Sequence, residues 1–131
     1  MVRGRRPPGI RLVGVDRAVH GELGSYVWAG RAVDSLLKAP AELVSVAIGT
    51  PLQFEGQGGV PDEASVSVFH RANLGQSSIG PVIQDQLDPN ELVWTANVDA
   101  GAYVLGLFQV WEGRGDAIHY FAIEVFPPDR E

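Results

Sequence analysis

The sequence predicts an all-β fold, a single antiparallel two-sheet β-sandwich, on three grounds. Several short runs alternate apolar and polar residues, which places successive side chains on opposite faces of a strand. The 131 residues include 16 glycines and 9 prolines, a content that favours a loop-rich β protein over a helical one. The third ground is an Asp-x-Gly-x-Tyr corner at residues 99–103, because such sandwiches use a tyrosine hydroxyl to bond nearby backbone.

The first half of the chain shows this alternation in separate short runs. Strands are expected there at residues 10–16, 26–28, 43–48 and 52–54. Residues 32–38 are expected to form a short helical turn, which Pro40 ends because the residue before a proline is disfavoured in a helix. In residues 43–48 the period of two is cleanest, as expected of a strand with one buried face.

The second half predicts the closing strands of the sandwich. These are expected at residues 64–70, 92–98, 103–111 and 118–126, and the last two flank a hairpin tip at 112–116. Seven to eight strands result, with turns at the spacing of a sandwich. The apolar phase of the alternating strands predicts a shared interior that contains Val44, Val46, Ile48, Val66, Val68, Trp94 and Val98.

Length and composition fit one domain with a sufficient core. Hydrophobic residues make up 45% of the chain, and its domain organisation is predicted as a disordered basic tail at 1–8, a β-sandwich at 9–127 and a C-terminal tail at 128–131. No apolar run approaches the roughly 18 residues of a transmembrane segment, so none is expected. The formal net charge is −6, although Arg3, Arg5 and Arg6 lie in the tail. The sandwich itself is therefore more acidic, which argues against nucleic acid as a partner.

The chain contains no cysteine, which excludes disulfides, thiolate metal sites and cysteine nucleophiles. Its three histidines, His20, His70 and His119, lie far apart and lack the spacing of a compact metal site. A catalytic trio could be drawn from Ser77 or Ser78 with His70 and Asp85, but the sequence has no Gly-x-Ser-x-Gly nucleophile elbow. We therefore expect no enzyme activity, no cofactor and no obligatory metal.

Two groups of residues are candidate sites. Asp85, Asp88, Asn90 and Glu91 form the densest cluster of oxygen ligands, of the kind that calcium prefers, but their order matches no EF-hand. The alternative is that these residues form a turn around Pro89.

The other candidate is a ligand-binding site at the hairpin tip, with Trp111, Arg114 and Asp116. Trp111 is the best candidate for an exposed aromatic, but edge packing is favoured even there, and Trp28 and Trp94 are expected in the core. Residues 114–116 also spell Arg-Gly-Asp, but glycine and aspartate are ordinary turn residues at a hairpin tip.

The chain resembles uncharacterised bacterial secreted or lipoprotein β-sandwich domains of immunoglobulin-like, fibronectin-III-like type. The resemblance rests on Gly24-Ser25-Tyr26-Val27-Trp28, Val33-Asp34, Ala100–Leu105, Trp111, Gly115-Asp116-Ala117 and Tyr120-Phe121. It implies an immunoglobulin-like sandwich with a tyrosine corner and a location outside the cytoplasm, but no known activity. Related domains often carry cysteines where this chain has Val27 and Ala32, so the disulfide that the resemblance implies is absent. A chain complete as given would instead be expected in the cytoplasm.

These observations predict a non-catalytic binding or structural module that acts through protein–protein contacts. The partner would be another protein or a second copy bound through strand edges. An alternative is a small-ligand or carbohydrate-binding domain that uses Trp111 and the loops near residues 56–62 and 71–90. A third hypothesis is a hydrolase with an unconventional site, which a strongly shifted pKa inside a cleft would favour.

Overall fold

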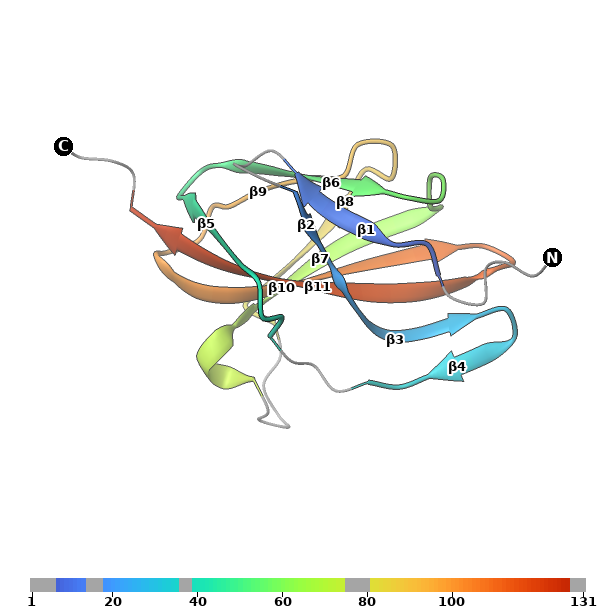
Figure 1. Cartoon of the computed structure of the whole chain (residues 1–131). Helices are drawn as coiled ribbons and strands as arrows, with labels where there is room; N and C mark the ends of the chain where they lie inside the picture. Colours follow the sequence, from blue (N-terminus) through green and yellow to red (C-terminus); the bar gives the residue numbers. More distant parts are fainter. Residues whose placement is uncertain (1–6, 14–17, 36–38, 75–80, 128–131) are drawn as a thin grey trace.

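The computed structural model describes residues 7–13, 18–35, 39–74 and 81–127. Figure 1 shows two β-sheets packed face to face, with the long strands β10 and β11 running through the middle of the molecule. The chain therefore has the predicted all-β, two-sheet sandwich fold. Among the described residues, no helix has the length and apolar character needed to cross a membrane.

The smaller sheet has four strands, and all its pairs are antiparallel. Their spatial order is β2 (Val19–His20), β1 (Ile10–Val13), β6 (Pro51–Gly56) and β9 (Val93–Thr95). The alternation of buried and exposed residues in β1 and β6 turns Leu12, Leu52 and Phe54 towards the larger sheet. Strand β9, with only three residues, ends this sheet on one side.

The larger sheet has seven strands. Six of them follow the order β4 (Arg31–Val33), β3 (Glu22–Trp28), β11 (Gly115–Phe126), β10 (Gly101–Trp111), β7 (Glu63–His70) and β8 (Ile83–Leu87). Strand β5 (Leu43–Ala47) pairs in parallel with the second half of β11, and β3 pairs with its first half. The short 3₁₀ helix η1 (Arg71–Asn73) follows β7.

The described residues form eleven strands, rather than the seven to eight that the sequence predicts. The added strands are β2, β4 and β8. Strands β2 and β4 have only two and three residues, which are strands because they pair with a neighbour and not because of an alternating run, whereas β8 has five residues. One of them, β4, occupies the start of the predicted helical turn at 32–38, so that prediction is wrong for residues 32 and 33, while 36–38 lie outside the described residues. Ala29 and Gly30 reverse the chain before it with φ of 54° and 78°, the left-handed values that a two-residue hairpin turn requires.

The core lies between the two sheets and contains the interior predicted from the alternation. Val44, Val46, Val66, Val68, Trp94 and Val98 are all buried there, and Ile48 packs against them. A second, smaller cluster at the β10–β11 hairpin end contains Trp28, Trp111 and Ala117. Its two indole rings meet edge to face with centroids 5.2 Å apart, a preferred geometry for aromatic pairs.

Tyr103, at the start of β10, makes the hydrogen bond that the Asp-x-Gly-x-Tyr spacing predicts. Its hydroxyl donates to the backbone carbonyl oxygen of Asp99 at 2.7 Å. Burial and, to a smaller extent, the charge of Asp99 raise the pKa of Tyr103, so the hydroxyl stays a donor. We expect Tyr103→Phe to lower the free energy of unfolding by about 1–3 kcal/mol, measured by urea denaturation. An unchanged midpoint would show that this bond contributes nothing.

The N-terminal end of the sandwich begins slightly earlier than the predicted boundary at residue 9. Pro7 is buried. Pro8 lies close to Gly58: a Cβ added to Gly58 would be 2.5 Å from the Pro8 Cβ. Gly9 accepts a hydrogen bond from the Gln57 N–H at 2.9 Å. Pro7 and Pro8 are therefore part of the packed structure, whereas residues 1–6 and 128–131 lie outside the described residues.

Candidate functional site

One side of the sandwich is open between the last strands of the two sheets. Strand β8 ends the larger sheet and β9 ends the smaller one, and in the described part of the chain neither pairs with a further strand. A groove of about 320 Å³ lies between them. It is lined by Ile83, Asp85, Gln86, Leu87, Val93, Trp94, Thr95 and Asn97.

The register of β8 determines which of its side chains face the groove. Ile83, Asp85 and Leu87 lie opposite Val68, Val66 and Ala64 of β7, which are buried in the core. Directly opposed residues share one face of a sheet, so these three side chains of β8 point inward. Ile83 and Leu87 pack against the core but stay partly exposed, because the three-residue strand β9 covers only part of this face.

Asp85 links the two sheets across the groove. Its Oδ2 accepts a hydrogen bond from the indole Nε1–H of Trp94 at 3.0 Å. Trp94 lies opposite Leu52 in the smaller sheet and is itself buried, so the bond fixes the indole at the base of the open side. Asp85 remains exposed, which leaves its carboxylate accessible to a partner in the groove.

A second hollow of about 340 Å³ lies on the flank of the smaller sheet. It is lined by Gln53, Phe54, Glu55, Gly56, Gly59, Val60, Pro89, Asn90, Glu91 and Leu92. The Glu55 carboxylate in its wall already accepts a hydrogen bond from Arg11 Nε at 2.9 Å. Trp111 is not among the lining residues of this hollow. Carbohydrate binding by Trp111 and the loop at 56–62 stays a prediction.

The predicted calcium ligands have local roles in the structure. Asp85 bonds Trp94, and the Oδ1 of Asp88 accepts the backbone N–H of Asn90 at 2.9 Å, which is the turn alternative for that residue. Asp88 and Glu91 pair across this turn. Within the described ranges, no three His, Cys, Asp or Glu side chains are grouped closely enough to hold a metal. Ion binding by Asp85, Asp88, Asn90 and Glu91 stays a prediction.

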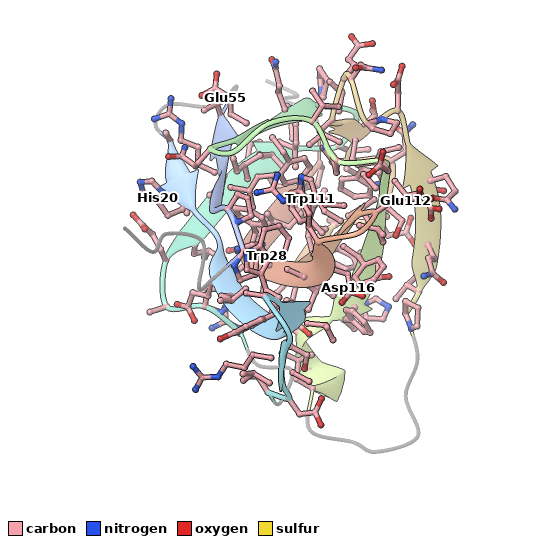
Figure 2. All side chains as sticks on the ribbon, turned by 90° about the vertical axis from the view of Figure 1, so that its right-hand side faces the viewer. His20, Trp28, Glu55, Trp111, Glu112 and Asp116 are labelled. Atoms are coloured by element: carbon pink, nitrogen blue, oxygen red, sulfur yellow. The ribbon has the colours of Figure 1, made fainter. Side chains whose placement is uncertain are left out.

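The hairpin tip does not present Trp111 to solvent, and the packed position favoured for it from the sequence is confirmed. Trp111 is 5% exposed, and Trp28 packs against it. The Arg114 guanidinium lies over the other indole, 5.3 Å from the Trp28 ring centroid. Figure 2 views this end and shows both tryptophans near the centre. Asp116 lies within β11, opposite Val27, so the Arg-Gly-Asp tripeptide is not a projecting loop. Ligand binding by Trp111, Arg114 and Asp116 stays a prediction.

The histidines are separated by the fold. His20 is exposed on the edge strand β2, and Figure 2 shows it far from the hairpin tip. His70 stacks on the Tyr103 ring with centroids 5.0 Å apart. His119 is buried on the inner face of β11, where burial lowers its pKa to about 4. The hydrolase hypothesis would require the group with the large pKa shift to lie in a cleft. His119 lies in the core instead.

Sequence reasoning singled out Asp85 but missed the groove around it. The signal available was Ile83-Gln84-Asp85-Gln86-Leu87, in which two apolar residues flank a charge on the same face of a strand. The contribution of Trp94 could not be found this way, because β8 and β9 belong to different sheets.

No family model matches the sequence, and no curated protein does so either. Among solved structures, CopC from Methylosinus trichosporium OB3b is similar with a TM-score of 0.51 and 18% identity, over 86% of this chain and 99% of CopC. The extracellular domain of the one-component system BT4673 from B. thetaiotaomicron gives a TM-score of 0.45 and 12% identity, over 82% of this chain and 15% of that one. The likeness to CopC concerns the fold alone: the chain is a β-sandwich that is similar to CopC in its fold.

Proposed function

We infer that this protein is a non-catalytic binding module that takes up an extended segment of a partner protein at the β8–β9 groove. The observation that carries this proposal is that two strand edges, neither paired further by any described residue, border one partly apolar groove. A free edge offers backbone N–H and C=O groups to an added strand, and alternate side chains of that strand would enter the groove.

The resemblance to bacterial secreted domains supports a location outside the cytoplasm. The Tyr103–Asp99 hydrogen bond supports an immunoglobulin-like type of sandwich, because that fold places a tyrosine at the start of its second-to-last strand. The position of His119 in the core, away from any groove, supports a non-enzymatic role.

The function is tested with heptapeptides selected from a displayed random library for binding to the full chain. Selected peptides should alternate apolar and polar residues, and amide exchange of β8 should slow when they bind. Ile83→Ala should weaken binding by about tenfold, since an apolar contact is removed. Val27→Ala is the matched control, because Val27 is 45% exposed on β3, away from the groove.

Two results would contradict the function. In one, the library yields no binder that depends on Ile83. In the other, selected peptides lose as much affinity with Val27→Ala as with Ile83→Ala, which would place binding elsewhere or show a general loss of stability. Circular dichroism of both variants separates misfolding from a loss of contact.

A further inference from the structure

Asp85 is a single negative charge at the centre of the inward-facing side of β8. Ile83 and Leu87 lie two residues to either side of it on the same face. A strand added to β8 would place its own alternate side chains over this row, one over each of the three residues. The side chain in the middle would meet the Asp85 carboxylate.

Covering this carboxylate is unfavourable unless the incoming segment pairs with it. The Trp94 indole N–H bonds Oδ2, and a carboxylate has further lone pairs on both oxygens that water reaches in the open groove. An added strand removes that water. A buried carboxylate without a positive partner is strongly destabilising, whereas a lysine or arginine at this position restores charge-assisted hydrogen bonds.

We propose that the groove selects extended segments with lysine or arginine facing Asp85 and an apolar residue two positions to either side, facing Ile83 and Leu87. The selected pattern is apolar-x-basic-x-apolar. This specificity rests on the proposed function, because it requires a strand added to β8. Uncharged strands are rejected because they leave the Asp85 carboxylate buried without a positive partner, so one residue both attracts the right partner and excludes wrong ones.

The same charge disfavours a second copy of this chain as the partner. A symmetric antiparallel pairing of two β8 strands centred on Asp85 would bring the two Asp85 side chains directly opposite each other. Inward-pointing charges are a known means of protecting edge strands from such pairing. The partner is therefore a basic segment of another protein.

The test uses three synthetic peptides that differ only at the central position. One is acetyl-Thr-Val-Thr-Lys-Thr-Val-Thr-amide, and in the other two norleucine or glutamate replaces the lysine. Binding to the full chain is measured by calorimetry at low salt. The lysine peptide should bind about tenfold more tightly than the norleucine peptide. Asp85→Asn, whose amide oxygen can still accept the Trp94 N–H, should remove that difference, and Asp85→Lys should favour the glutamate peptide.

The outcomes distinguish a failure of the selection for a basic residue from a failure of the proposed binding at β8. If lysine and norleucine peptides bind equally and both slow the amide exchange of β8, the function stands and the selection by charge is wrong. If no peptide binds, including those selected from the library, the function itself fails. Should the variants not fold, the salt dependence in the unmodified chain decides: the advantage of the lysine peptide must shrink as salt rises.

Discussion

Gly115→Ala should lower the free energy of unfolding by about 4 kcal/mol, since it forces a backbone shift in a packed region. A Cβ at Gly115 would lie 1.9 Å from the Val27 carbonyl oxygen and 3.0 Å from Trp28 Cε3. Gly115 pairs with Trp28 on one side and Trp111 on the other. The substitution would thus separate β3 from β11 and open the tryptophan pair. Urea denaturation followed by tryptophan fluorescence measures the loss.

Gly113→Ala is the matched control for this prediction. Gly113 also has a positive φ, 79°, but a Cβ there would meet no atom within 4 Å. Its substitution should cost only about 1 kcal/mol, the ordinary cost of a left-handed alanine. Equal losses in the two variants would show that backbone conformation, and not the contact with Val27, dominates at Gly115.

Acidification should destabilise the protein through His119. Its pKa is lowered from 6.5 to about 4 in the folded chain, because burial disfavours the charged imidazole. Its cross-strand neighbours are Leu107 and Leu23, which offer no compensating charge. Between these two values the unfolded chain binds a proton that the folded chain does not, so stability rises with pH there. The loss from about pH 7 to about pH 5 should reach about 2 kcal/mol.

Comparison with His119→Gln isolates this effect. The free energy of unfolding is measured at both pH values in each protein. Carboxylates contribute equally to the two proteins, so the difference between their pH slopes belongs to His119. The assignment would be overturned if the variant lost as much stability on acidification as the unmodified chain.

Most of the fold could be predicted from the sequence, because the alternation of apolar and polar residues in a strand is visible among neighbouring residues. In residues 43–48 and 64–70, period-two patterning identified both the strands and their buried faces, and Val46 and Val68 lie in the core as predicted. The parallel pairing of β5 with β11 has no local signal, since it joins segments far apart in the chain. The partner that buries Trp111 has no local signal either, because Trp28 comes from another strand.

The candidate site was only partly predictable. The residue types at 83–87 showed an apolar face with a charge in it, but not that β8 would end a sheet. Edges arise from the order of all strands, which short patterns do not specify. The turn role of Asp88, by contrast, follows from a bond to a residue two positions away and was open to prediction.

The position of β11 between β10 and the parallel strand β5 has a mechanical consequence. Tension on the chain beyond Phe126 acts along β11, whose end is held by β10 on one side and β5 on the other. Hydrogen bonds in these ladders lie across the strands, so such a pull loads them together in shear and does not peel them apart in sequence. Strand β8 takes no part in these two ladders, because β10 and β7 lie between it and β11, and β9 belongs to the other sheet.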